Sequence, residues 1–393
     1  MDPIQNPFSP GAGTPPPELV GRSQILSRAD ILLKRMKQGR PEKGILLTGL
    51  RGVGKTVLLN RINHLAQETG YHTMFIEAPE ERSLVALLTP QLRHLLLELS
   101  MGTGTVKRAR RALAVLKAFV STVRVRYGEI ELGMDVDPER GTADSGNLET
   151  DLSDLFTAVG EAAHEGHSAV ALFVDEMQYL EEAELQALIM AMHRLQQQAL
   201  PFTMVGAGLP TLRGKAGKAK SYAERLFDFT PIGELPSTEA ARAIRDPVKG
   251  AGADIERAAL EEICRLTQGY PYFLQEWGYQ SWNRAAQSPI RLQDVQSATT
   301  VVIQRLDEGF FHVRFDRLTP SERRFLAAMA QLGAGPHQTG DVAAALRIKV
   351  TSLGPVRASL INKGMIYGPE HGRLAFTVPL FDEFMKRTMP SGP

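Results

Sequence analysis

The chain has 393 residues, of which 43% are hydrophobic and 23% charged, so it is long enough for two or three domains of ordinary globular composition. Its formal net charge of +1 excludes a strong overall preference for nucleic acid or membranes, and the single Cys264 excludes both an internal disulfide and a thiolate metal cluster. Because the N-terminus lacks a signal-peptide pattern and no run of about 18 apolar residues occurs, we expect a cytoplasmic protein without a membrane partner.

The first 18 residues contain six prolines, which predict an extended N-terminal arm that is ordered only if it packs on the body. Apolar runs then alternate with helical patterns. Strands are expected at residues 44–48, 72–77, 169–174, 201–205 and 227–235, with helices at 22–37, 54–68, 83–120, 148–165 and 181–198. This alternation predicts an α/β fold with a mostly parallel sheet and helices on both faces. Alternating residues at 123–136 predict a hairpin, and residues 137–147 a mobile loop.

The last third of the chain has a different pattern. Residues 237–300 are predicted to be entirely helical and to form a second unit. Thr319-Pro-Ser-Glu322 then predicts a helix start with a Thr cap, a first-position proline and a third-position Glu. Helices are expected at 320–332, 339–347 and 351–363, followed by a hairpin of 365–367 and 373–378. Three helices and a hairpin form the plan of a winged helix.

The segment from Gly49 to Thr56 matches the phosphate-binding pattern G-x-x-x-x-G-K-[ST] at every fixed position. An apolar strand precedes it and a helix follows. Glycines let successive backbone N–H groups point at an anion, and the new helix offers its positive end. We expect Lys55 to hold the β- and γ-phosphates of ATP and Thr56 to ligate Mg²⁺. The expected nucleotide-binding residues of this loop are Gly49, Leu50, Arg51, Gly52, Val53, Gly54, Lys55, Thr56 and Val57.

Asp175 and Glu176 follow directly after the apolar strand 169–174. An acidic pair after a strand often only caps a helix. In phosphate-loop ATPases, however, Asp at this position holds the metal and Glu polarises the attacking water. Together with the loop at 49–56, the pair predicts ATP hydrolysis, with Glu176 and Lys55 as catalytic residues and Asp175 as a metal ligand.

The chain resembles the AAA-type ATPases related to origin-recognition proteins, whose archaeal-type and bacterial members carry a C-terminal winged helix. The resemblance covers roughly residues 18–388 and rests on the segments Glu18–Arg22, Gly208–Pro210, Leu266–Gln275, Ser352–Ile366 and Val378–Phe381. It implies an arm at 1–18, a P-loop ATPase domain at 19–236 with a basic insertion at 101–147, a helical lid at 237–305 and a winged-helix domain at 314–389.

The resemblance also implies further site residues. Val20, Gly21 and Arg22 would lie near the adenine, with Pro271 closing over it. Arg225 occupies the position of the arginine that reaches a neighbour's ATP in assembled rings, although a solvated surface arginine fits the sequence as well.

Two departures from the family put efficient hydrolysis in doubt. The fourth strand ends in Val205-Gly-Ala-Gly208, without the usual polar sensor, although Thr203 is nearby. The lid segment Gly269–Tyr272 lacks an arginine.

Three basic patches are candidates for contact with double-stranded DNA. Residues 101–128 contain seven Lys or Arg and no acid, a loop carries Arg213, Lys215, Lys218 and Lys220, and the expected winged helix carries Lys349, Arg357, Lys363 and Arg373. Residues 148–190 contain ten acids and no Lys or Arg, which suggests a polarised surface able to self-associate. Two functions stay open: an ATP-driven switch that controls DNA binding or assembly, or a signalling or scaffold ATPase whose winged helix binds protein.

Overall fold

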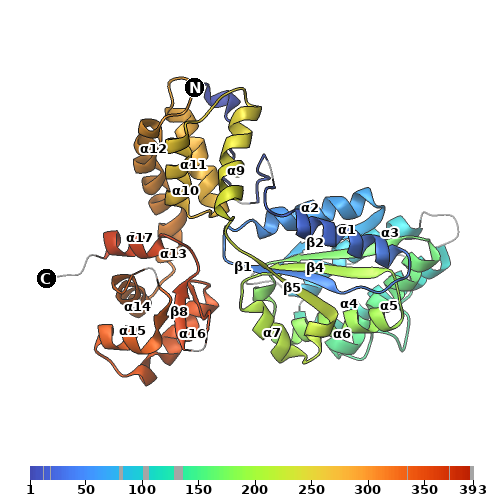
Figure 1. Ribbon diagram of the computed structural model, residues 1–393. Coiled ribbons are helices and arrows are strands. Elements are labelled where there is room, and N and C mark those ends of the chain that lie inside the picture. Colours follow the sequence, from blue (N-terminus) through green and yellow to red (C-terminus); the bar gives the residue numbers. More distant parts are fainter. Residues whose placement is uncertain are drawn as a thin grey trace. The chain divides into compact units, whose positions relative to one another are not determined.

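The computed structural model describes residues 1–389 except positions 12, 18, 79–82, 101–105, 128–135, 334 and 371. The chain divides into two compact units (Figure 1). One unit, here the sheet unit, contains Arg22–Gly49 and Lys55–Ile232. The other, here the helical unit, contains Met1–Gly21, Leu50–Gly54 and Gly233–Pro393. None of the helices in these described ranges is long and apolar enough to cross a membrane.

The sheet unit is built on five parallel strands in the order β2-β3-β4-β1-β5. The strands are β1 (Gly44–Gly49), β2 (Tyr71–Glu77), β3 (Ala169–Asp175), β4 (Phe202–Gly208) and β5 (Phe227–Ile232). Every residue of β3 and β4 is buried. Continuous apolar runs are expected for strands covered on both faces, so the predicted parallel sheet is confirmed.

Helices cover both faces of this sheet, with α1 and α2 on one side and α5, α6 and α7 on the other (Figure 1). The helices are α1 (Ser23–Lys37), α2 (Lys55–Glu68), α3 (Leu84–Ser100), α4 (Val106–Tyr127), α5 (Leu148–Glu165), α6 (Glu182–Gln197), α7 (Leu212–Ala219) and α8 (Ala223–Leu226), with a 3₁₀ turn at Met177–Tyr179. Asn147 caps α5 by accepting from the N–H groups of Glu149 and Thr150 at 3.0 and 3.2 Å. Such caps satisfy amides that would otherwise lack partners.

The predicted hairpin at 123–136 is wrong in its first half. Helix α4 continues to Tyr127, and residues 128–135 lie outside the described part. Extending an existing helix fixes one residue for each new hydrogen bond, whereas a hairpin must be nucleated anew. Five alternating residues, Val-Arg-Val-Arg-Tyr, are too few to outweigh that advantage.

The helical unit begins with a bundle, here the helical bundle, of α9 (Ser237–Gly250), α10 (Arg257–Thr267), α11 (Pro271–Arg284) and α12 (Leu292–Arg305). Helix α12 continues through a π-helix (Leu306–Phe311) into α13 (His312–Phe315). The Phe311 ring contacts Phe384 of the last helix, with centroids 5.3 Å apart. A continuous helical connection therefore links the bundle to the C-terminal residues.

The remainder of the helical unit is here called the C-terminal segment. Its elements are α14 (Pro320–Gln331), β6 (His337–Gln338), α15 (Thr339–Leu346), a 3₁₀ turn (Val350–Leu353), α16 (Gly354–Asn362), β7 (Ile366–Tyr367), β8 (Arg373–Phe376) and α17 (Phe381–Thr388). The strands pair antiparallel in the order β6-β8-β7, so the expected hairpin gains a third strand. The predicted cap of α14 is confirmed, because Thr319 and Glu322 each accept from the other's backbone N–H, at 3.4 and 2.7 Å.

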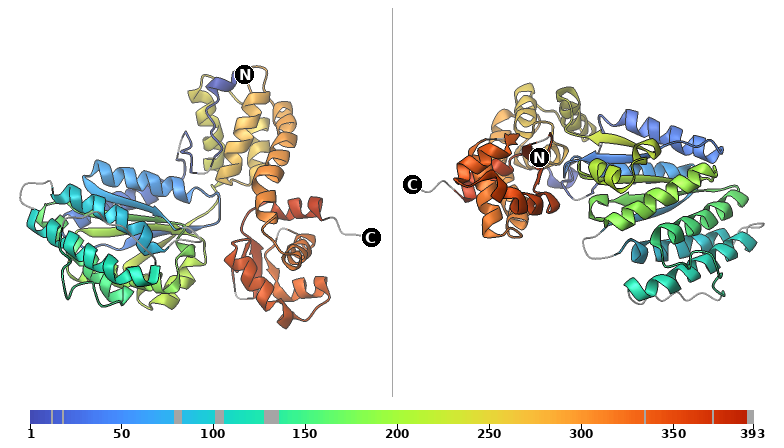
Figure 2. Two further views of the ribbon diagram at one scale, coloured as in Figure 1. Left: turned by 180° about the vertical axis from the view of Figure 1, so that it is seen from behind. Right: turned by 90° about the horizontal axis from the view of Figure 1, so that it is seen from below.

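The N-terminal residues pack on the helical bundle, where Figure 2 shows the dark-blue start of the chain beside the yellow and orange helices. The Phe8 side chain is buried against Gly278 of α11, where a Cβ would lie 2.7 Å from the ring. Asn6 donates to Asn283 at 2.8 Å, and the Trp282 indole donates to the Asp2 carbonyl at 2.8 Å. This segment is therefore held by α11.

Candidate functional site

The phosphate loop connects β1 to α2 and curls as its sequence requires. Gly52 and Gly54 have φ angles of +82° and +90°, which side-chain-bearing residues rarely adopt. A Cβ on Gly52 would also lie 3.0 Å from the Tyr270 ring. The Gly52 carbonyl accepts from the Tyr272 N–H at 3.2 Å. The tip of the loop, Leu50–Gly54, is therefore bonded to the first turn of α11 within the helical unit.

Thr56 and Asp175 meet at the carboxyl edge of the sheet. The Thr56 hydroxyl donates to Asp175 Oδ2 at 2.6 Å, across 119 positions of sequence. Asp175 is 3% exposed, and burial raises its pKa, while hydrogen bonds from Thr56 and the Glu176 N–H act in the opposite direction. Two adjacent oxygen ligands in a buried position suit Mg²⁺, which prefers oxygen. These residues therefore fit the expected metal.

Glu176 lies directly beside this pair in an unusual backbone conformation. Its φ is +51°, in the left-handed region that is costly for a residue with a side chain. The Gln178 amide Nε2 donates to the Glu176 carboxylate. On its other side, Gln178 Oε1 accepts from the Leu209 N–H at 3.0 Å. The chain thus holds the carboxylate in place from the end of β4.

Neighbouring side chains fill the space beside the two glycines at the end of β4. A Cβ on Gly206 would lie 2.2 Å from Met177 Sδ, and one on Gly208 would lie 3.0 Å from Gln178 Oε1. Thr203, which the sequence placed nearby, is buried opposite Ala171 near the start of the strand. The turn at 177–178 therefore occupies the space where the fourth strand ends. Sequence reasoning missed Gln178, although its position two residues after Glu176 was a signal.

The second basic patch is partly directed inward. Lys215 of α7 donates to the carbonyls of Gln178, at 2.9 Å, and Leu180, and burial lowers the pKa of its ammonium group. Lys220 pairs with Glu149 at 2.7 Å. Arg213 and Lys218 are exposed. Lys215 and Lys220 of this candidate patch therefore bind groups within the chain.

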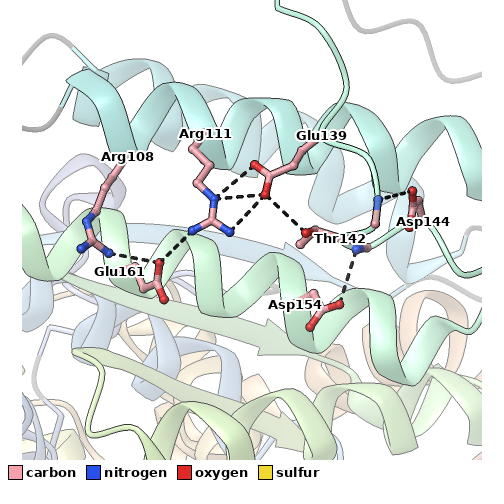
Figure 3. A network of polar contacts seen from close by, with 9 residues as sticks. Arg108, Arg111, Glu139, Thr142, Asp144, Asp154 and Glu161 are labelled. Atoms are coloured by element: carbon pink, nitrogen blue, oxygen red, sulfur yellow. Dashed lines mark hydrogen bonds and ion pairs between the residues drawn. The ribbon is translucent and has the colours of Figure 1, made fainter.

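Two arginines of the basic run, Arg108 and Arg111, pair with acidic residues of the adjacent helix α5. Arg108 donates to Glu161 at 3.1 Å, and Arg111 donates to Glu139 at 3.1 Å. Figure 3 shows both contacts. Arg108 also pairs with Glu165 at 2.7 Å. The expected polarised surface is therefore partly neutralised within the chain, which weakens the case for head-to-tail association. Lys107 and Arg110 remain exposed.

The four residues expected around the adenine differ in burial, in backbone conformation and in the element to which they belong. Val20 is 7% exposed, and Gly21 has a left-handed backbone beside Leu235. Arg22 precedes α1, and Pro271 begins α11. Arg225 is exposed on α8, two residues before β5. Within the described ranges it forms no ion pair.

In the C-terminal segment Lys363, one of the residues expected to contact DNA, forms two contacts within the chain. The Lys363 ammonium donates to the buried Glu322 carboxylate at 2.7 Å and to the Arg317 carbonyl at 2.8 Å. Arg373 approaches Glu370 at 3.5 Å, Arg357 is partly buried, and Lys349 is exposed. Lys363 therefore binds two groups within the C-terminal segment.

Parts of the chain match two protein families and a relative of known name. Residues 18–205 match the AAA ATPase domain family, and residues 308–385 match a domain of unknown function, DUF8462. The Holliday junction branch migration complex subunit RuvB of Salinispora tropica is 26% identical in an alignment of 286 residues that covers 65% of this chain and 71% of that protein.

Two solved structures are also similar. The Walker-type ATPase PABY2304 of Pyrococcus abyssi superposes with a TM-score of 0.63 at 15% identity, over 96% of this chain and 99% of that one. The ORC1 protein of Aeropyrum pernix, solved in complex with DNA, gives a TM-score of 0.45 at 15% identity, over 95% of this chain and 94% of that one. The fold is that of AAA-type P-loop ATPases.

Proposed function

We propose that this AAA-type ATPase uses the binding and hydrolysis of Mg-ATP as a switch that controls DNA binding or assembly through its C-terminal segment, which we interpret as a winged helix. The observation that carries the proposal is the contact of 2.6 Å between Thr56 and Asp175, with Glu176 as the next residue. It joins the phosphate loop to the acidic strand end in the arrangement that hydrolysis requires.

In the proposed site each residue has one role. Backbone N–H groups of the loop and the Lys55 ammonium would bind the phosphates, and Thr56 and Asp175 would hold the metal. Mg²⁺, when bound, supplies charge neutralisation for the phosphoryl group that is transferred. Glu176 orients the attacking water and accepts its proton. Val20, Gly21, Arg22 and Pro271 are proposed to enclose the adenine.

The proposed switch starts at the tip of the loop. Because Gly52 bonds to Tyr272, a nucleotide that reshapes the loop changes the contacts at the start of α11. The aromatic ring of Tyr272 stacks on Phe310 of the π-helix, with centroids 4.9 Å apart. Phe311 in turn contacts α17. This chain of contacts offers a physical route from phosphate binding to the C-terminal segment.

DNA as the partner is supported by the relative whose name assigns it to a Holliday junction branch migration complex. Lys349, Arg357 and Arg373 are the cations proposed to contact phosphates. A mobility-shift assay at low salt with ATP, ADP and no nucleotide tests this. We expect duplex DNA to bind in a nucleotide-dependent way. The absence of binding in all three states would refute it.

A specific observation favours the alternative, in which the C-terminal segment binds protein. Ile348 and Val350 are 46% and 51% exposed on either side of Lys349. Exposed apolar side chains suit a protein partner better than a phosphate backbone. Size-exclusion chromatography of a Glu176→Gln variant, which should retain ATP, tests this alternative. It predicts an ATP-dependent increase in size without DNA affinity.

A further inference from the structure

The side chain of Gln178 connects the acidic strand end to the end of a neighbouring strand. Its Nε2 donates to the Glu176 carboxylate, and its Oε1 accepts from the Leu209 N–H at 3.0 Å. The orientation of the amide is fixed by chemistry, because a carboxylate can only accept and a backbone N–H can only donate. Gln178 therefore bridges two groups that are 33 positions apart in sequence.

The surroundings of Gln178 are shaped to hold it. Gly208 leaves space for the amide, since a Cβ there would lie 3.0 Å from Oε1. Met177 fills the space above Gly206. The Gln178 carbonyl accepts from Lys215 at 2.9 Å, and the Leu180 carbonyl accepts from the same ammonium. The turn is thus anchored by α7 from one side and by β4 from the other.

We propose that Gln178 is a positioning residue for hydrolysis, which holds the Glu176 carboxylate in the orientation that activates water. The proposal rests on the role of Glu176 proposed above. In this proposal the glycines at the end of β4 make space for the Gln178 side chain. The polar group beside Glu176 is then the Gln178 amide from the turn after β3, and not a side chain of β4. Lys215 supports this arrangement by fixing the backbone of that turn.

Displacing a catalytic group lowers kcat but leaves the affinity for the substrate unchanged. A Gln178→Met variant keeps the volume of the side chain and removes both hydrogen bonds. We expect kcat for ATP to fall about 10- to 100-fold, the range produced by a displacement of roughly 1 Å. The KM and the affinity for a fluorescent ATP analogue should stay within twofold. Gln197→Met, at the exposed end of α6, is the matched control and should behave as wild type.

A second variant separates the two hydrogen bonds. Gln178→Glu keeps an acceptor for the Leu209 N–H and replaces the donor by a carboxylate that repels Glu176. Its kcat should fall at least as far as that of Gln178→Met. If Gln178→Glu and Gln178→Met both retain kcat within twofold of wild type, the proposal is wrong. Thermal unfolding of each variant shows whether a loss of rate reflects a loss of folded protein.

A double-mutant cycle distinguishes positioning from a purely structural effect. In a Glu176→Asp background the shorter carboxylate no longer reaches the amide, so Gln178→Met should change the single-turnover rate less than threefold. If Gln178→Met lowers the single-turnover rate by the same factor in the Glu176→Asp background as in wild type, the proposal is wrong. Glu176→Gln tests the underlying function separately: if that variant still hydrolyses ATP at the wild-type rate, the proposed role of Glu176 fails, whatever Gln178 does.

Discussion

The ion pair of Lys363 and Glu322 allows a quantitative prediction about the C-terminal segment. Burial raises the pKa of Glu322, but hydrogen bonds from Lys363, Ser359 and Thr319 outweigh this and bring the pKa from 4.5 to about 2. A shift of that size corresponds to roughly 3 kcal/mol of stability near neutral pH. Because the Lys363 side chain is 35% exposed, solvent screens part of this, and we expect Lys363→Met to cost about 2 kcal/mol.

Hydrogen exchange measured at pH 7 detects this loss in the intact chain. Amides of α14 and α16, which the pair connects, should exchange about 30-fold faster in Lys363→Met, because about 1.4 kcal/mol corresponds to a factor of ten. The matched control is Lys349→Met, an exposed lysine just before the 3₁₀ turn. Its effect on exchange should be less than threefold, as for most surface substitutions.

The opposite outcome would refute the structural role of Lys363. If Lys363→Met left exchange in α14 and α16 unchanged and instead weakened duplex binding tenfold, the lysine would face DNA. The Glu322 carboxylate would then need another partner. The two readouts are independent, since one reports opening of the segment without ligand and the other reports affinity for a ligand.

Three further predictions concern pH, hydrolysis and assembly. The stability that Glu322 contributes is fully present above pH 4.5 and is lost as the pH falls toward 2, because its folded pKa is the lower one; the difference in unfolding free energy between wild type and Lys363→Met should shrink over that range in acid titrations. Glu176→Gln should retain Mg-ATP in equilibrium binding while hydrolysis falls at least 100-fold, whereas Lys55→Ala should lose binding; equal losses in both would place Glu176 in binding instead. If Arg225 acts on a neighbour's ATP, Arg225→Ala should abolish any rise of specific activity with protein concentration, and added Lys55→Ala protein should restore it; an unchanged concentration profile would leave Arg225 a surface arginine.

Local patterns were sufficient to predict the sheet and the phosphate loop. Continuous apolar runs mark strands covered on both faces, and β3 and β4 are buried throughout. Gly52 and Gly54 are required by the backbone itself, so their presence in the sequence carries direct structural information. The contact between Thr56 and Asp175 followed because strands that meet at one sheet edge bring their ends together.

Long-range pairing could not be predicted in the same way. Gln178 acquires its role only when Leu209, 31 positions later, arrives beside it. Arg108 looked like a free cation because its partner Glu161 lies 53 positions away. Lys363 and Glu322 are separated by 41 positions. The sequence of a basic segment and an acidic segment is the same whether the two face solvent or pair with each other. Charge runs alone therefore could not show that Arg108 pairs with Glu161.

The N-terminal contacts with α11 have a consequence for synthesis of the chain on the ribosome. Asn6 and Asn283 are 277 positions apart, so at 5–20 residues per second Asn283 is synthesised roughly 15 to 55 s after Asn6. Throughout that interval the Phe8 ring cannot pack against Gly278, because Gly278 has not yet been synthesised. Residues 2–8 therefore reach their final contacts only after α11 has been synthesised, so they complete the helical bundle rather than nucleate it.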